Sequence, residues 1–109
     1  MGPVVYERER RSARMFKHIR VAVSGKNKAG KRFREAAETI VISADGGMLH
    51  VAQPLEIDVF LVLTSPFAQE EQECRVAYLG DDSEEGQHVG VEFLTPAPHF
   101  WGVDFKQPD

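Results

Sequence analysis

Apolar and polar residues alternate along most of this 109-residue chain, and this two-residue period constrains the fold more than any other feature. In residues 18–24, Ile19, Val21 and Val23 fall on one face of an extended backbone, as expected of a half-buried strand. No segment of eleven or more residues follows the 3.6-residue period of a helix. We therefore expect an all-β fold, because short strands without crossover helices pack as antiparallel barrels or sandwiches.

Six or seven strands are expected, separated by breaks rich in glycine and proline. The predicted strands cover residues 18–24, 31–42, 48–51, 57–64, 74–79 and 88–93. Residues 100–105, with three aromatic rings, are either a last short strand or an aromatic plug. Turns are predicted at residues 25–30, 43–47 and 80–86, where glycine permits backbone angles that other residues avoid.

The length fits a single domain that spans residues 1–109, with a core at about 15–105 and a flexible basic arm at 1–14. A lone cysteine, Cys74, cannot form an internal disulfide, so nothing in the sequence favours secretion. No apolar run approaches the length of a membrane span. We expect a cytoplasmic protein with no membrane partner.

Charge is distributed unevenly along the chain, although the net charge is only −4. Residues 8–34 hold eleven of the thirteen Lys and Arg but one acid, Glu9. Residues 35–109 hold fifteen of the seventeen acids. Such a one-sided field can steer an anionic ligand toward the N-terminal third. Alternatively, the basic and acidic thirds become neighbours and balance each other in the folded domain.

Four arginines, Arg8, Arg10, Arg11 and Arg14, precede the first predicted strand. Arg10 and Arg14 form the pattern R-x-x-x-R, with Arg11 between them. Guanidinium groups are planar and permanently charged, and they bind phosphate through two parallel hydrogen bonds. The cluster therefore suggests an anionic, phosphorylated ligand. The alternative is a solvated tail, which is the usual role of a charged N-terminal run.

The sequence offers no arrangement typical of catalysis or metal binding. The four histidines are scattered, without the close pairs that zinc sites use. Ser43 is outside any G-x-S-x-G pattern, and the glycines at 25 and 30 lack the Lys-Ser or Lys-Thr of a phosphate-binding loop. We expect no enzyme activity, no metal and no resident cofactor.

Several short motifs occur in an order that resembles the PilZ domain family over residues 7–105. After the arginine pair comes Ser43-x-x-Gly46 at a strand–turn–strand junction. The later motifs are the apolar strand 57–64, the segment Arg75-Val76-Ala77-Tyr78 and the segment Val89-Gly90-Val91-Glu92-Phe93. Each motif is short, and the resemblance is carried by their order and spacing.

The resemblance implies a six-stranded antiparallel β-barrel of PilZ type with a basic N-terminal arm. It also implies a receptor or regulatory module that binds the bacterial second messenger cyclic di-GMP. On this reading Arg10 and Arg14 hold the phosphates and stack on guanine, with Arg11 beside them. Ser43 and Gly46 complete the ligand-binding surface on the barrel.

The family's second signature, Asp/Asn-x-Ser-x-x-Gly, would have its acid or amide at Val41. Valine cannot accept hydrogen bonds from a guanine edge, which leaves polar ligand atoms unsatisfied at roughly 1–3 kcal/mol each. Asp45, four residues on, is another source of a carboxylate. The alternative function is a PilZ-like interaction domain that binds a downstream protein without nucleotide. Its predicted contact residues are Phe100, Trp101 and Phe105, unless these aromatics plug the barrel.

A third function, a small barrel that binds single-stranded nucleic acid, fits the basic segment less well. Such proteins interleave aromatic side chains with basic ones, and the basic third has only Tyr6, Phe16 and Phe33. The overall acidity also opposes binding to a polyanion. We therefore expect no nucleic acid polymer as a partner.

Overall fold

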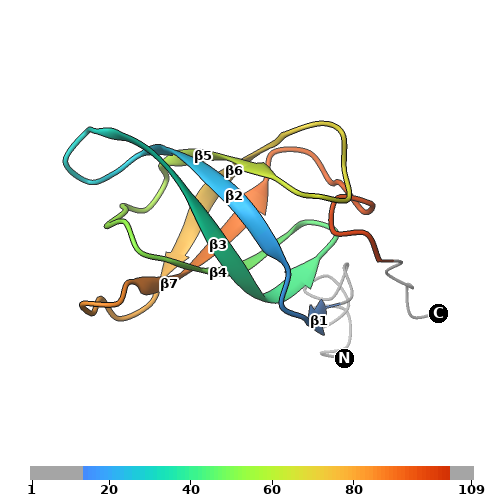
Figure 1. Cartoon of the computed structure of the whole chain (residues 1–109), viewed down its shortest axis with the longest axis horizontal. Helices are drawn as coiled ribbons and strands as arrows, with labels where there is room; N and C mark the ends of the chain where they lie inside the picture. Colours follow the sequence, from blue (N-terminus) through green and yellow to red (C-terminus); the bar gives the residue numbers. More distant parts are fainter. Residues whose placement is uncertain (1–13, 104–109) are drawn as a thin grey trace, which may run out of the picture.

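The structure, a computed structural model, describes residues 14–103, which form seven β-strands and no helix (Figure 1). The strands are β1 (Arg14–Phe16), β2 (Arg20–Lys26), β3 (Arg32–Ser43), β4 (Gly46–Val51), β5 (Phe60–Thr64), β6 (Gln72–Leu79) and β7 (Gln87–Phe93). The predicted all-β class is confirmed. Among these residues there is accordingly no long apolar helix of the kind that crosses a membrane.

Six of the strands close into a barrel in which every neighbouring pair is antiparallel. The hydrogen-bonded order is β3, β2, β5, β6, β7 and β4, and β4 pairs back onto β3. β1 is an additional strand that pairs with β3. The six-stranded antiparallel barrel expected from the sequence is therefore present, together with β1, which lies outside the predicted strand ranges (Figure 1).

The extra strand exists because β3, at twelve residues, is longer than any of its neighbours. β2 pairs with the first part of β3, and β1 pairs with its last three residues. Buried Thr39 bridges the gap between β1 and β2, donating to the Lys17 carbonyl at 2.6 Å and accepting from the Ile19 amide at 2.8 Å. The assignment of Arg14 to a flexible arm was therefore wrong, since Arg14 lies in β1.

A β-bulge in β3 changes which side chains point into the barrel. The register with β4 shifts between Thr39 and Val41, so Ile40 is an extra residue in the ladder. Thr39 is buried before the bulge and Ile42 is buried after it. Because side chains alternate along a strand, Val41 and Ser43 consequently lie on the outer face.

A second bulge occurs in β6, where Val76 opposes Val91 of β7 but Tyr78 opposes Gly90. Ala77 is the extra residue. Val76 is fully buried, whereas Tyr78, two positions later, is 53% exposed. The bulge thus turns an aromatic ring outward that strict alternation would have buried.

The core fills the barrel and is closed at one end by aromatic rings from the C-terminal segment. Trp101 is fully buried and Phe100 nearly so. Their ring centroids lie 5.7 and 5.4 Å from that of Phe93, and 4.9 Å from each other. Up to residue 103 this segment is therefore the plug rather than a strand. Of the two alternatives given for Phe100 and Trp101, the structure supports the plug and not an exposed contact surface, and Phe105 lies outside the described residues.

All six predicted strands differ from the structure by one to three residues at one end or both, and two of these differences have identifiable reasons. The strand expected at 57–64 begins only at Phe60, because Asp58 adopts a positive φ of 72° that an extended strand excludes. β4 begins at Gly46 rather than residue 48, because the β3–β4 turn needs only Ala44 and Asp45.

Candidate functional site

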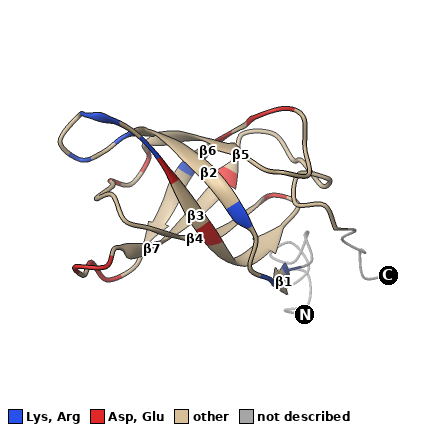
Figure 2. Cartoon of the chain, viewed as in Figure 1, with Lys and Arg blue, Asp and Glu red and all other residues tan. Residues whose placement is uncertain are grey.

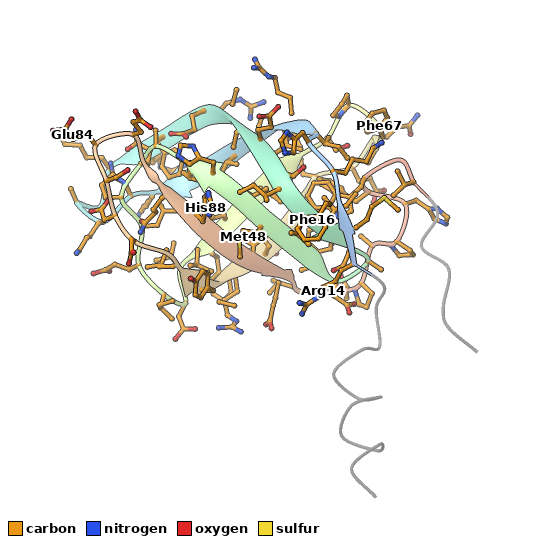
Figure 3. The ribbon with its side chains drawn as sticks, turned by 90° about the horizontal axis from the view of Figure 1, so that it is seen from below. Arg14, Phe16, Met48, Phe67, Glu84 and His88 are labelled. Carbon is orange, nitrogen blue, oxygen red and sulfur yellow. The ribbon has the colours of Figure 1, made fainter. Side chains whose placement is uncertain are left out.

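The short strand β1 brings two of the predicted ligand-binding residues together. In its register with β3, Arg14 lies opposite Ser43 and Phe16 lies opposite Val41. The side chains of Arg14 and Phe16 are on the outer face, with Phe16 85% exposed, whereas Met15 between them packs against the core. Figure 3 shows Arg14 and Phe16 at the edge of this face.

The Ser43 hydroxyl takes part in the tight turn between β3 and β4. Its oxygen accepts a hydrogen bond from the Asp45 amide at 3.2 Å, and its O–H donates one to the Gly46 carbonyl at 3.4 Å. Such local bonds are typical of serine in turns. Ser43 therefore has a structural role, and its remaining acceptor capacity is what a ligand can use.

The same turn is held from the other side by the C-terminal part of the chain. The Ser43 carbonyl accepts a hydrogen bond from the indole Nε1–H of Trp101 at 2.8 Å. The Ala44 carbonyl accepts one from the Ala97 amide at 3.0 Å, and the Asp45 carbonyl accepts one from the Phe93 amide at 2.8 Å. Three consecutive carbonyls are thus bonded to residues 93–101, which fixes the position of Ser43 relative to the barrel.

Gly46 is required by the closure of the barrel. Its φ is +153°, and it lies opposite Glu92 of β7. A Cβ atom at this position would lie 2.1 Å from the carbonyl oxygen of Val91. Only glycine allows β7 to approach β4 this closely. The fold alone accounts for this glycine of the predicted signature.

An apolar row crosses the outer face beside Arg14 and Ser43. Strand register places Phe16 next to Val41, and Val41 next to Met48 of β4. Met48 is opposite Gly90 of β7, and Gly90 is opposite Tyr78 of β6. A Cβ atom added at Gly90 would lie 3.1 Å from the Cβ atom of Tyr78. We call this set the outer apolar row. Figure 3 shows Phe16 and Met48 in it.

The sequence reasoning missed the outer apolar row, because its members come from five strands and only the registers bring them together. Val41, the departure from the family's signature, lies within this row rather than isolated among polar groups. The signal available in the sequence is Phe16 itself, an aromatic residue two positions after Arg14 and outside every predicted strand.

A parallel row beside it is polar and leads from the candidate site to an ion-pair cluster. Gly46 is opposite Glu92, and Glu92 is opposite Arg75 of β6. The Arg75 guanidinium donates to Glu92 Oε1 at 2.6 Å and to the Asp58 carboxylate. The hydrogen bond that Arg75 donates to Glu92, followed by the one it donates to Asp58, raises the pKa of Arg75. These are the ion pairs formed among residues 14–103.

Two histidines continue the outer face on the far side of the apolar row. His50 of β4 is directly opposite His88 of β7, and their ring centroids are 5.9 Å apart in an edge-to-face arrangement. Within the described part of the chain, no group of three or more His, Cys, Asp or Glu side chains is arranged to hold a metal.

Cys74 is buried in the core and is not a nucleophile at neutral pH. Burial raises the pKa of its thiol from 9.0 to about 12. The thiol donates a long hydrogen bond, 3.6 Å, to the carbonyl of Leu61. It therefore remains protonated and behaves as a small apolar side chain.

The basic residues do not form one continuous patch on the described structure. The hairpin between β2 and β3 carries exposed Lys26, Lys28, Lys31, Arg32 and Arg34. Figure 2 shows this hairpin at one end of the molecule and β1, with Arg14, at the other. Of the predicted ligand-binding residues, Arg14, Ser43 and Gly46 thus lie beside one another on neighbouring strands. Arg10 and Arg11 lie outside the described residues.

Comparison of the chain with protein-family models, curated proteins and solved structures found no match. The function is therefore argued from the arrangement of Arg14, Ser43 and the outer apolar row.

Proposed function

We propose that this chain is a PilZ-like receptor domain that binds cyclic di-GMP on the outer face of the barrel, where β1, β3 and β4 meet. The observation that carries the proposal is the register of β1 on β3, which puts Arg14 directly opposite Ser43. The arginine and serine of two motifs 29 positions apart in the sequence are cross-strand neighbours.

Arg14 is suited to bind a phosphate of the ligand. It is exposed, and it forms no ion pair with another described residue. Hydrogen bonds between arginine and phosphate are charge-assisted and contribute about 1.5–3 kcal/mol each. In the proposal Arg10, one R-x-x-x-R spacing earlier, binds the second phosphate, and Arg11 adds to the positive field.

The outer apolar row supplies a surface on which the purine rings can lie. Phe16, Val41 and Met48 form the part of this row nearest Arg14. Stacking of a base on an aromatic ring such as Phe16 contributes about 1–3 kcal/mol. Val41, between Phe16 and Met48, offers apolar contact instead of a hydrogen bond. The proposed binding mode therefore relies on phosphate contacts and stacking at this position.

Isothermal titration calorimetry of the full chain with cyclic di-GMP at moderate salt tests the proposal. We expect saturable binding by the wild-type chain and its loss in Arg10→Ala and Arg14→Ala. Arg34→Ala is the matched control, because Arg34 is an exposed arginine far from the proposed site. It lies on β3, as Ser43 does, but nine residues earlier, which is roughly 30 Å at about 3.3 Å per residue. The proposal fails if the wild-type chain gives no heat at high micromolar nucleotide.

The outer apolar row also favours a second candidate function, nucleotide-independent binding of a downstream protein. Its two end rings, Phe16 and Tyr78, are 85% and 53% exposed, and exposed apolar patches often mark protein contacts. Phe16→Ser should abolish capture of the partner whether or not cyclic di-GMP is present. Phe60→Ser is the control, since Phe60 is 59% exposed but lies outside the row.

A further inference from the structure

Glu92 is the first acid along the row of cross-strand neighbours that starts at Arg14. From Arg14 the polar row runs through Ser43 on β3 and Gly46 on β4 to Glu92 on β7. The Glu92 side chain is 61% exposed and is on the outer face. Three strand spacings, or roughly 14 Å, separate the Arg14 and Glu92 backbones. The Arg14 side chain and one nucleotide together can cover this span.

No side chain stands between Ser43 and Glu92, because the residue between them is Gly46. The fold requires this glycine for the approach of β7, and its backbone is buried against that strand. A ligand that spans β3, β4 and β7 can therefore meet the arginine at one end and the carboxylate at the other with no β4 side chain between them.

The Glu92 carboxylate is held in a fixed direction. Arg75 donates to its Oε1 at 2.6 Å, and Arg75 is itself held by Asp58 on its other side. No hydrogen bond from another described residue to Oε2 is present. A carboxylate can accept about four hydrogen bonds, so Glu92 can still accept hydrogen bonds from a ligand. Because Arg75 already holds the side chain in place, little conformational entropy is lost when the ligand binds.

Resting on the cyclic di-GMP binding proposed above, we infer that Glu92 reads the guanine base and makes the site select guanine over adenine. Guanine presents two adjacent donors, N1–H and the N2 amino group, which match the two oxygens of a carboxylate. Adenine has an acceptor at N1, which a carboxylate repels. Glu92 thereby supplies the hydrogen-bond acceptor that Val41 lacks, from a different strand.

The decisive experiment titrates the full chain with cyclic di-GMP and, separately, with cyclic di-AMP. Glu92→Gln should weaken cyclic di-GMP binding about tenfold to a hundredfold. It should not weaken cyclic di-AMP binding, because it removes the carboxylate that repels the adenine N1 atom. Glu73→Gln is the matched control, because it removes one exposed carboxylate from the neighbouring strand β6 and changes the net charge equally. This control should bind both nucleotides like the wild type.

Asp45→Asn distinguishes Glu92 from the other nearby carboxylate, which belongs to the β3–β4 turn. The inference is overturned if Asp45→Asn removes the guanine preference, or if Glu92→Gln binds both nucleotides as the wild type does. In either case the proposed function stands, provided that the wild type binds cyclic di-GMP. A wild-type chain that binds neither nucleotide overturns the proposed function, and this inference with it.

Discussion

The indole Nε1 of Trp101 donates a 2.8 Å hydrogen bond to the backbone carbonyl of Ser43, 58 positions earlier in the chain. Trp101 is fully buried and stacks on Phe93, so this bond ties the aromatic plug to the turn that carries the candidate site. Because the Ala44 and Asp45 carbonyls are also bonded to the C-terminal segment, the geometry of this turn depends on the plug.

Trp101→Phe should destabilise the domain by about 1–3 kcal/mol, because it removes the indole donor and leaves a carbonyl unsatisfied. Trp101→Ala, which also empties the plug, should cost about 3–5 kcal/mol. Urea denaturation measures both. The comparison variant is Phe60→Leu at an exposed position, with an expected change within about 0.5 kcal/mol. Equal stability of Trp101→Phe and the wild type would show that the Ser43 carbonyl is satisfied in another way.

Gly46→Ala should destabilise the barrel by more than about 3 kcal/mol, since it combines a positive φ with overlap against the next strand. Its Cβ would lie 2.1 Å from the Val91 oxygen. Gly30→Ala separates the two causes, because Gly30 has a φ of +83° but nothing within 4 Å of its Cβ. For that variant we expect about 1–2 kcal/mol from backbone strain alone. Similar losses in both variants would argue against the steric role of Gly46.

The alternation of residues predicted the barrel because each strand has one face in the core, as in Ile19, Val21 and Val23. The same rule could not predict the bulges at Ile40 and Ala77, where one extra residue exchanges the two faces. β1 was missed because three residues are too short to show a period. It is a strand only because the end of β3 lacks β2 as a neighbour.

The candidate site was predictable only where its residues form local motifs, as Ser43 and Gly46 do. The pairing of Arg14 with Ser43 depends on register, which no local pattern encodes. The cluster of Arg75 with Asp58 and Glu92 joins residues 17 positions apart on either side, so sequence proximity gave no sign of it.

Thr39→Val should release β1 from the barrel more than it destabilises the whole domain. Valine has nearly the same shape but cannot bond the Ile19 amide or the Lys17 carbonyl, at a cost of about 1–3 kcal/mol. Hydrogen exchange should accelerate most at the Lys17 amide, which bonds to the Ile40 carbonyl at 3.2 Å. Thr64→Val on β5 is the control, and it should leave that exchange rate unchanged. A uniform acceleration over all strands would instead indicate a purely global effect.

Alkaline pH should destabilise the domain through Cys74. The folded state raises the pKa of the thiol from 9.0 to about 12, so between these values the unfolded chain loses a proton that the folded chain keeps. This contribution to stability is complete below pH 9 and is lost as the pH rises toward 12, by about 1.4 kcal/mol per pH unit. Denaturant unfolding from pH 8 to 11 measures the slope.

Cys74→Ala isolates the contribution of the thiol to this pH dependence. The variant should start from a lower stability, because the sulfur fills space in the core, but its stability should fall less steeply with pH. The difference in unfolding free energy between the wild type and the variant should therefore become smaller above pH 9. Parallel curves for the variant and the wild type would mean that the thiol ionises as readily in the folded barrel as in the unfolded chain.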